Sequence, residues 1–248
     1  MKKGQVLLIT VMLFATALTV ALAVAFQGTT ETQVSKMETD SQRALSAAEA
    51  AIESSLNSGQ TVTIGAGDLS SINGISGAAT LTSVTSTDFT SPTLVKDSSY
   101  TFYLGDYDSS TGTIGASTSQ NILLCFGGSG VSPALEITLI KATSVKKYLV
   151  DPGARIANAA AGTTGCGASN SFPSSYTIPA ADIGADGQLL VVRALYDSTK
   201  VLFHGTSNFP SQGRTATSQA TTTTGVSKKV TLFQSNPQIP AEFFTTSF

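Results

Sequence analysis

The sequence predicts an α+β protein in which one long N-terminal helix packs on a mostly antiparallel β-sheet domain. Residues 5–26 carry no charged side chain, and helix-compatible sequence continues from there to residue 58. Beyond residue 59 the sequence is rich in Ser, Thr and Gly, and apolar and polar side chains alternate in the period of half-buried strands. We therefore expect a helix over residues 5–58 and a β-rich globular domain over residues 59–248, preceded by a short basic segment, residues 1–4.

The uncharged segment 5–26 is long enough to cross a membrane as a helix. At 1.5 Å per residue it spans about 33 Å, against a hydrocarbon layer of about 30 Å. Lys2 and Lys3 precede it, and positively charged residues hold the adjoining end of such a helix in the cytoplasm. We expect a single pass through the cytoplasmic membrane, with the N-terminus in the cytoplasm and the β-rich domain outside.

A cleaved secretory signal is the alternative for this segment. Residues 21–23 and 23–25 both fit the A-x-A pattern of a signal-peptidase site, and cleavage there predicts a mature start near Phe26. The apolar stretch is, however, longer than the usual apolar core of a signal peptide, about 7–15 residues. Cleavage would also leave the following helix without the upstream part of its apolar stripe, so we favour a retained helix.

The helix is expected to continue past the membrane as an amphipathic segment, because apolar side chains recur there at three- and four-residue steps. These side chains are Val34, Met37, Leu45, Ala48, Ile52 and Leu56. A patch of alanines within residues 44–51 permits close approach of a sheet or another backbone. We expect the lower part of the helix to dock on the chain's own sheet and the upper part to remain free for other subunits.

These features together resemble a type IV pilin or pseudopilin: a basic leader ending in Gly4, an immediately apolar helix, an amphipathic extension and a β-rich domain. Residues 43–52 are similar to the A-A-E-A stretch of minor pilins with a PilX-type N-terminal segment. The resemblance implies that residues 1–4 are a leader, that a prepilin peptidase cuts after Gly4, and that the new N-terminal residue, Gln5, is methylated. It implies as partners other pilin subunits and the pilus assembly machinery in the cytoplasmic membrane.

The sequence departs from major pilins at two positions. Ile9 stands where major pilins carry a glutamate, whose burial in lipid is repaid only by a partner cation. An apolar residue there resembles some minor pilins and the tip-forming pseudopilin of type II secretion. Gln5 also departs from the Phe, Met or small apolar residue that is more common there. The expected assembly helix thus presents Ile9, Val34, Met37, Leu45, Ala48 and Ile52, in a minor or tip subunit.

The β-rich domain is expected to contain strands near residues 61–64, 79–84, 100–104 and 226–233, with a hairpin over residues 135–150. A second hairpin is expected over residues 189–204, with residues 197–199 as its loop. The Ser/Thr/Gly-rich segments 106–120, 159–175 and 206–225 are expected to be loops, and the threonine tract 221–224 could equally be a solvated edge or a spacer.

Cys125 and Cys166 fall in the part expected outside the membrane, where oxidising conditions favour pairing. We predict a disulfide, with two unpaired thiols as the alternative. The bond would stabilise the domain by roughly 3–4 kcal/mol in the chain-entropy model.

The sequence gives little support for catalysis, metal binding or nucleic-acid binding. The single histidine, His204, has no sequence neighbours that would form a triad or a metal site. The glycine-rich segments 65–67 and 127–130 lack the lysine of a phosphate loop, and Asp182 and Asp186 lack the spacing of an EF-hand. A formal net charge of −2 does not favour direct nucleic-acid binding. We expect no enzymatic activity and no cofactor.

The expected function is therefore that of a structural subunit of a type IV pilus or related filament, which moves from the cytoplasmic membrane to a cell-surface filament. One alternative is a signal-anchored extracellular β-domain that binds a surface ligand and does not polymerise. Another is a secreted enzyme whose signal is removed, with a mature start near Phe26.

Overall fold

The computed structural model describes the backbone of residues 3–128, 130 and 132–240, and side chains from residue 10 onward. Met1 and Lys2 of the expected leader lie outside the described residues, and of Gly4, Gln5 and Ile9 only the backbone is described. Within this range the protein combines one long N-terminal helix with antiparallel sheets, so the α+β class is confirmed.

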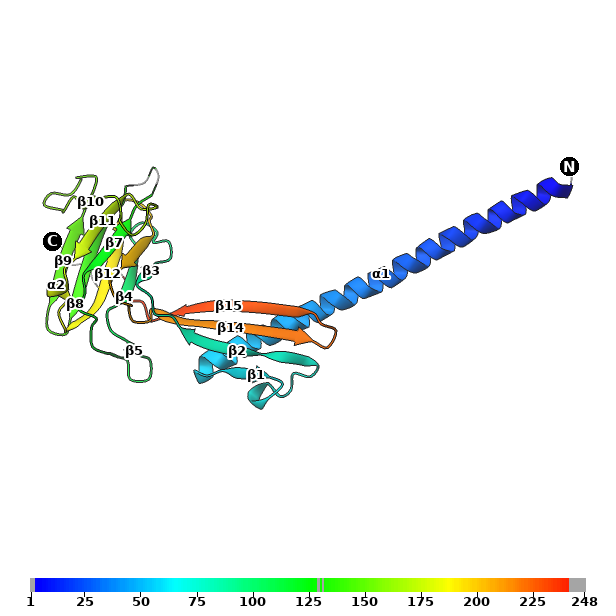
Figure 1. The fold of residues 1–248 in the computed structure, drawn as a ribbon, viewed down its shortest axis with the longest axis horizontal. Coiled ribbons are helices and arrows are strands. Elements are labelled where there is room, and N and C mark those ends of the chain that lie inside the picture. Colours follow the sequence, from blue (N-terminus) through cyan, green and yellow to red (C-terminus); the bar gives the residue numbers. More distant parts are fainter. Residues whose placement is uncertain (1–2, 129, 131, 241–248) are drawn as a thin grey trace. The chain divides into compact units, whose positions relative to one another are not determined.

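The N-terminal helix α1 extends without a break over Lys3–Ser58 (Figure 1). Its length is about 84 Å at 1.5 Å per residue. Gly28 does not interrupt it. The helix ends at Ser58, and the following residue, Gly59, has the positive φ of 70° that terminates many helices. The Gly59 N–H donates to the Ser55 carbonyl at 2.9 Å.

The chain forms two compact units. Unit 1 holds the residues up to Leu81 together with Ala216–Leu232, and unit 2 holds Thr82–Thr215 and the residues from Phe233 onward. Residues 59–248, expected as one globular domain, are therefore shared between the two units.

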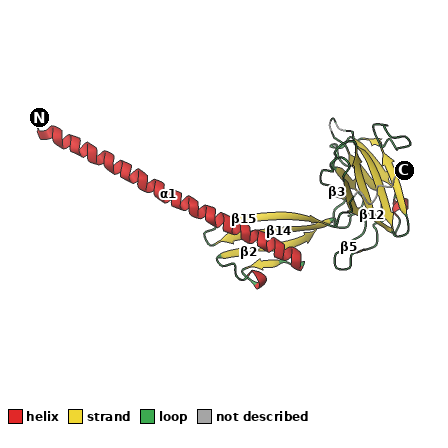
Figure 2. Ribbon diagram, turned by 180° about the vertical axis from the view of Figure 1, so that it is seen from behind, coloured by secondary structure: helices red, strands yellow, loops and turns green. Residues whose placement is uncertain are grey.

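Unit 1 is built around a four-stranded antiparallel arrangement that supports the lower part of α1 (Figure 2). Its strands, in the order β1-β2-β14-β15, are β1 (Val62–Ile64), β2 (Ile75–Ser83), β14 (Gly213–Thr222) and β15 (Ser227–Ser235), with the short 3-10 helix η1 (Gly67–Leu69) after β1. Residues 82–83, 213–215 and 233–235, at the ends of these strands, belong to unit 2. A Cβ on Gly77 would lie 1.9 Å from the Gln219 carbonyl oxygen. Glycine is thus required where β2 approaches β14.

Unit 2 contains two sheets that enclose an aromatic core. One sheet has the order β10-β11-β7-β13-β3, and the other has the order β4-β12-β8-β9. Phe102 of β4 and Phe203 of β13 stack with ring centroids 4.1 Å apart, so the sheets pack face to face as a β-sandwich. Phe209 meets Phe102 edge-on at 5.0 Å.

The first sheet consists of β10 (Thr163–Thr164), β11 (Ser174–Ile178), β7 (Ile122–Phe126), β13 (Val201–His204) and β3 (Asp88–Thr90). The second consists of β4 (Ser99–Tyr103), β12 (Gly187–Leu195), β8 (Ala134–Lys141) and β9 (Val145–Val150). The remaining elements are the small hairpin of β5 (Tyr107–Asp108) and β6 (Thr113–Ile114), and the short helix α2 (Ala180–Ile183).

Two glutamine side chains close the open edge of β4. Gln212 accepts the Tyr103 backbone N–H at 2.8 Å and donates to the Tyr103 carbonyl at 2.9 Å. Gln238 makes the same pair of bonds with Thr101, at 2.8 and 3.3 Å. Each amide takes the place of a peptide group in a neighbouring strand, which blocks pairing of this edge with another chain.

The hairpin expected over residues 135–150 is confirmed as β8 and β9, which pair from Leu135 with Val150 to Ile140 with Val145. The hairpin expected over residues 189–204 is wrong. Strand β12 pairs with β4 and β8, whereas β13 pairs with β3 and β7, so the connection between them crosses from one sheet to the other. Pairing with strands that are distant in sequence therefore determines where β12 and β13 lie, although only a short loop connects them.

Segment 206–225 is not a loop, because it contains β14. On this strand the buried residues are Ala216, Ser218 and Ala220, and they alternate with threonines and a glutamine. Because these buried side chains are small, the sequence lacks the alternation of large apolar and polar residues that usually marks a strand. Segment 106–120 contains the β5-β6 hairpin, and segment 159–175 contains β10 and the start of β11.

Candidate assembly surface on the N-terminal helix

The upper part of α1, residues 10–26, is apolar and is not covered by the rest of the chain on any side. Its large side chains are 58–79% exposed: Val11, Met12, Leu13, Phe14, Leu18, Val20, Leu22, Val24 and Phe26. Because consecutive residues of a helix point about 100° apart, the run from Val11 to Phe14 alone covers the whole circumference. Side chains of this kind need an apolar solvent, either lipid or other helices.

Among the described residues, α1 is the one helix that is long and apolar enough to cross a membrane. This is consistent with anchoring by a single pass.

Threonines within this part of α1 are compatible with an apolar environment, because their hydroxyls donate hydrogen bonds to backbone carbonyls one turn back. The Thr16 hydroxyl donates to the Leu13 carbonyl at 3.0 Å, and the Thr19 hydroxyl donates to the Thr16 carbonyl at 2.8 Å. An unbonded hydroxyl in a hydrocarbon layer would cost several kcal/mol, on the order of 2–7. The helix therefore satisfies its own polar side chains.

The lower part of α1 is buried against the chain's own sheet. Ala44, Ala48 and Ala51 are fully buried, and Ile52 is 5% exposed. Alanines of this stripe share a core cluster with Ile64 of β1, Ala79 of β2 and Ala220 of β14. Small residues on both sides let the helix backbone approach the sheet closely, so the expected docking of the lower part is confirmed.

A change of environment occurs near Asp40. Every described residue from 10 to 39 is exposed, and Ala44 is the first buried residue. The Thr224 hydroxyl, in the turn between β14 and β15, donates to the Asp40 carboxylate at 2.7 Å and ties the end of the sheet to the helix.

The expected assembly residues therefore fall into two groups. Ala48 and Ile52 contact the chain's own sheet and are not available to another subunit. Val34, Met37 and Leu45 are 58%, 62% and 40% exposed. Val34 and Met37 continue the docked stripe towards the N-terminus, beyond the point where the sheet covers it.

After Lys3, the next charged residue of α1 is Glu31, which limits the membrane-compatible part of the helix to the uncharged residues between them. Among the described residues of α1 no ion pair occurs. From Glu31 onward the helix has more acidic than basic side chains, at positions 31, 36, 38, 40, 43, 49 and 53. This stretch suits the water or headgroup region rather than the hydrocarbon.

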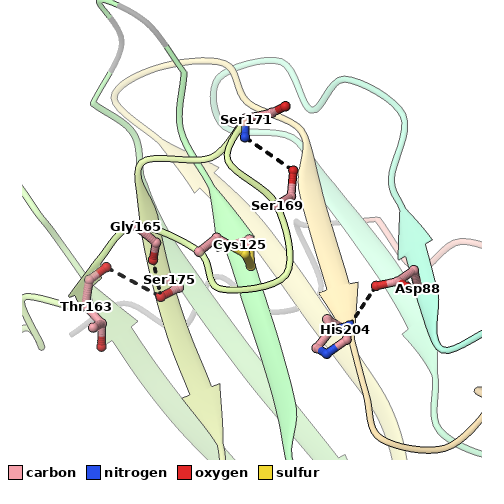
Figure 3. Close-up of a disulfide and its surroundings, with 9 residues drawn as sticks. Asp88, Cys125, Thr163, Gly165, Ser169, Ser171, Ser175 and His204 are labelled. Carbon is pink, nitrogen blue, oxygen red and sulfur yellow. Dashed lines mark hydrogen bonds and ion pairs between the residues drawn. A yellow bond between two sulfur atoms is a disulfide. The ribbon is translucent and has the colours of Figure 1, made fainter.

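Cys125 of β7 and Cys166 form the predicted disulfide, with their Cα atoms 5.7 Å apart (Figure 3). The bond holds the loop before β11 over the outer face of its sheet, where the two sulfurs cluster with Leu202, Leu123 and Phe172. The Ser175 hydroxyl, which donates to the Gly165 carbonyl at 2.7 Å, fixes the same loop.

His204 has one carboxylate partner that the sequence did not reveal. Its Nδ1 lies 2.7 Å from Asp88 Oδ1, because β13 and β3 pair these residues directly (Figure 3). The two are far apart in sequence, so only the strand pairing brings them together. Among the described residues no group of three or more His, Cys, Asp and Glu is arranged to hold a metal.

Asp182 and Asp186 are engaged in ion pairs. Lys146 lies 2.5 Å from Asp182, and Lys141 lies 3.0 Å from Asp186. The Lys146 contact and the Tyr148 hydroxyl both lower the pKa of Asp182. Burial, followed by the bond to Asp182, raises the pKa of Tyr148. The contacts of Asp182 join α2 to β9.

No family model, curated protein or solved structure matches this chain.

Proposed function

We propose that this protein is a pilin-like subunit, minor or tip-forming, that is cleaved after Gly4 and assembled into a filament through α1. Before assembly α1 anchors it in the cytoplasmic membrane, with the N-terminus in the cytoplasm. Its partners are other pilin subunits, the prepilin peptidase and the assembly machinery. The observation that carries the proposal is the contrast along α1 between an uncovered apolar upper part and a lower part docked on the chain's own sheet.

The apolar part of α1 suits two environments in turn. Lipid tails are about as apolar as leucine side chains, so moving the helix from lipid to a bundle of similar helices costs little hydrophobic free energy. Close packing between helices then provides the attraction. A side chain such as Phe14, at 79% exposure, would be covered in both states and is uncovered only in the isolated chain.

Val34, Met37 and Leu45 are the side chains that we assign to contacts between subunits outside the membrane. Leu45 adjoins the docked alanines, Val34 and Met37 precede them on the same helix, and all three are exposed. A neighbouring helix that packs on them would bury apolar surface at about 25 cal/mol per Å². Ile9, an apolar residue where major pilins carry a glutamate, is the reason for assigning a minor or tip position.

Replacing Gly4 by leucine in the native cell tests the proposal. We expect the uncleaved protein to accumulate in the membrane and to disappear from purified surface filaments. Gly28→Leu is the matched control, because it enlarges a glycine of the same helix where a Cβ meets nothing within 4 Å. The control protein should still lose its leader.

If Gly4→Leu leaves the size and location of the protein unchanged, the assembly proposal is wrong. The protein would then be a signal-anchored extracellular domain.

A further inference from the structure

Unit 2 contains a polar cavity of about 650 Å³ that the proposed assembly does not use. Four segments that are distant in sequence line it: the β5 hairpin, the chain after β2, the start of β14 and the end of β15. Charged and aromatic members of the lining are Asp106, Tyr107, Asp108 and Arg214, and Gln234 and Asn236 add side-chain amides.

The wall formed by the β5 hairpin is held in a fixed shape. A Cβ on Gly105 would lie 2.3 Å from the Gly115 carbonyl oxygen, so the two strands of its base approach closely. The Asp108 carboxylate accepts the Ser110 N–H at 2.8 Å and the Ser110 hydroxyl at 2.7 Å. These bonds lower the pKa of Asp108 and use its carboxylate to form the turn.

Tyr107 belongs to the same wall and is supported from behind. Its ring packs against Tyr103 with centroids 5.3 Å apart. The Tyr103 hydroxyl donates to the Pro237 carbonyl at 2.7 Å, so the supporting ring is itself fixed. An aromatic ring placed in this way offers a rigid packing surface to a ligand.

The opposite wall is also fixed by close contacts. A Cβ on Gly213 would lie 2.2 Å from the Gln234 carbonyl oxygen. The Asn236 side-chain amide donates to the Ser211 carbonyl at 2.9 Å, and the Asn236 backbone N–H donates to the Gln212 carbonyl at 2.9 Å. The cavity is therefore built into the fold between two rigid walls.

Charges of opposite sign line the cavity without neutralising one another. Among the described residues Arg214 makes no ion pair, and its guanidinium donates only to the Ser109 hydroxyl, at 3.5 Å. Asp106 is exposed, and its side chain has no hydrogen bond or ion pair within the described part of the chain. Both groups remain available to a ligand.

We propose that this cavity binds a neutral saccharide of a few sugar units. Each sugar hydroxyl both donates and accepts hydrogen bonds, so it can donate to Asp106 and accept from Arg214, and the amide of Gln234 can do either. The apolar C–H face of a sugar ring packs on the ring of Tyr107. The cavity volume lies within the usual range for small-ligand sites, about 300–1,000 Å³.

Other ligand classes fit the lining less well. A phosphate or other small anion would meet the carboxylates of Asp106 and Asp108, and a cationic peptide would meet Arg214. An apolar ligand would leave Asp106 and Arg214 without partners, and such unpaired groups cost binding free energy.

The test uses the full-length protein reconstituted in discs of phosphatidylcholine, which avoids detergents with sugar headgroups. Discs are passed over an array of neutral di- to tetrasaccharides of glucose, galactose, mannose and N-acetylglucosamine, with empty discs as the blank. We expect retention on at least one of these saccharides. Tyr107→Ala and Asp106→Asn should each weaken that binding at least tenfold, with thermal unfolding unchanged.

Asp68→Asn and Tyr196→Ala are the matched controls, because they remove the same kinds of group at positions that do not line the cavity. They should bind as the wild type does. The proposal is overturned if no saccharide of the array is retained, if the Tyr107 and Asp106 variants bind equally well, or if only charged peptides compete for the cavity. Filament assembly is not needed for any of these outcomes, so failure here leaves the proposed function intact.

Discussion

The two compact units bury different kinds of core. Unit 1 packs α1 on its sheet through alanines, and Ile64 and Ile52 are the largest buried side chains in that contact. Unit 2 encloses Phe102, Phe126, Phe203 and Phe209, and adds a disulfide and an ion pair whose carboxylate is buried. The difference indicates a division of roles: unit 2 is stabilised by its own interior, whereas unit 1 holds a helix at close range and leaves the large apolar side chains of that helix to outside partners.

Phe203→Ala should have the largest effect, because it removes a fully buried ring that packs on three other aromatic rings. We expect unit 2 to lose about 3–5 kcal/mol of unfolding free energy. Hydrogen exchange resolved by segment would measure the loss separately for each unit.

Phe233→Ala is the matched control for this deletion, since Phe233 is 47% exposed. It should cost much less. An equal cost for the two variants would contradict the assignment of an aromatic core to unit 2.

Removing the disulfide with the double substitution Cys125→Ala and Cys166→Ala should destabilise unit 2 by about 3–4 kcal/mol. The cysteines are 41 residues apart, so the bond closes a long loop in the unfolded chain. Denaturant unfolding of the variant should resemble that of the reduced wild type. Unchanged stability of unit 2 would show that its interior does not depend on the loop before β11.

Asp151 makes the stability of unit 2 dependent on pH. Its fully buried carboxylate binds the Arg155 side chain at 2.7 Å and the backbone N–H groups of Arg155, Gly153 and Ile156. The Arg155 side chain, followed by the backbone donors, lowers the pKa of this carboxyl below its usual value.

A lowered pKa means that the folded state holds the proton less tightly than the unfolded state does. The stabilisation is therefore complete above the ordinary carboxyl pKa, near pH 4, and is lost as the pH falls below it. Asp151→Asn should cost about 2–3 kcal/mol at neutral pH and should reduce the dependence of unit 2 on acid. Acid unfolding curves of the two proteins check this, and curves of the same slope would contradict it.

Ala48→Leu tests the close packing of unit 1. The fully buried alanine has no room for a larger side chain, and overpacking of this kind costs about 1–3 kcal/mol. Ala25→Leu introduces the same side chain in the exposed upper part of α1 and should leave the stability of unit 1 unchanged. Protease cleavage at the lower end of α1 would report the difference. Equal resistance of the two variants would show that the docked contact is loose.

Several elements of the fold can be predicted from patterns within short stretches of the sequence. The extent of α1 follows from an uncharged stretch and a three- and four-residue repeat, and the hairpin of β8 and β9 follows from alternation around a short turn. The disulfide follows from two cysteines in a segment expected outside the membrane.

Features that depend on distant partners could not be predicted in this way. Strand β14 escapes recognition because Ala216 and Ala220 are too small to mark an apolar face. The crossing between β12 and β13 is set by strands that lie far from both in sequence. The contact of Asp40 with Thr224 and the polar cavity could not be predicted from the sequence for the same reason, since the segments that form them come together only in the folded chain.

The most direct test of the central claim, that α1 is kept and moves from lipid into a filament, is the N-terminal sequence of the protein recovered from purified surface filaments. We predict a mature chain that begins at Gln5 and retains the whole apolar part of α1. A chain that begins near Val24 or Phe26, or the absence of this protein from the filaments, would contradict the claim.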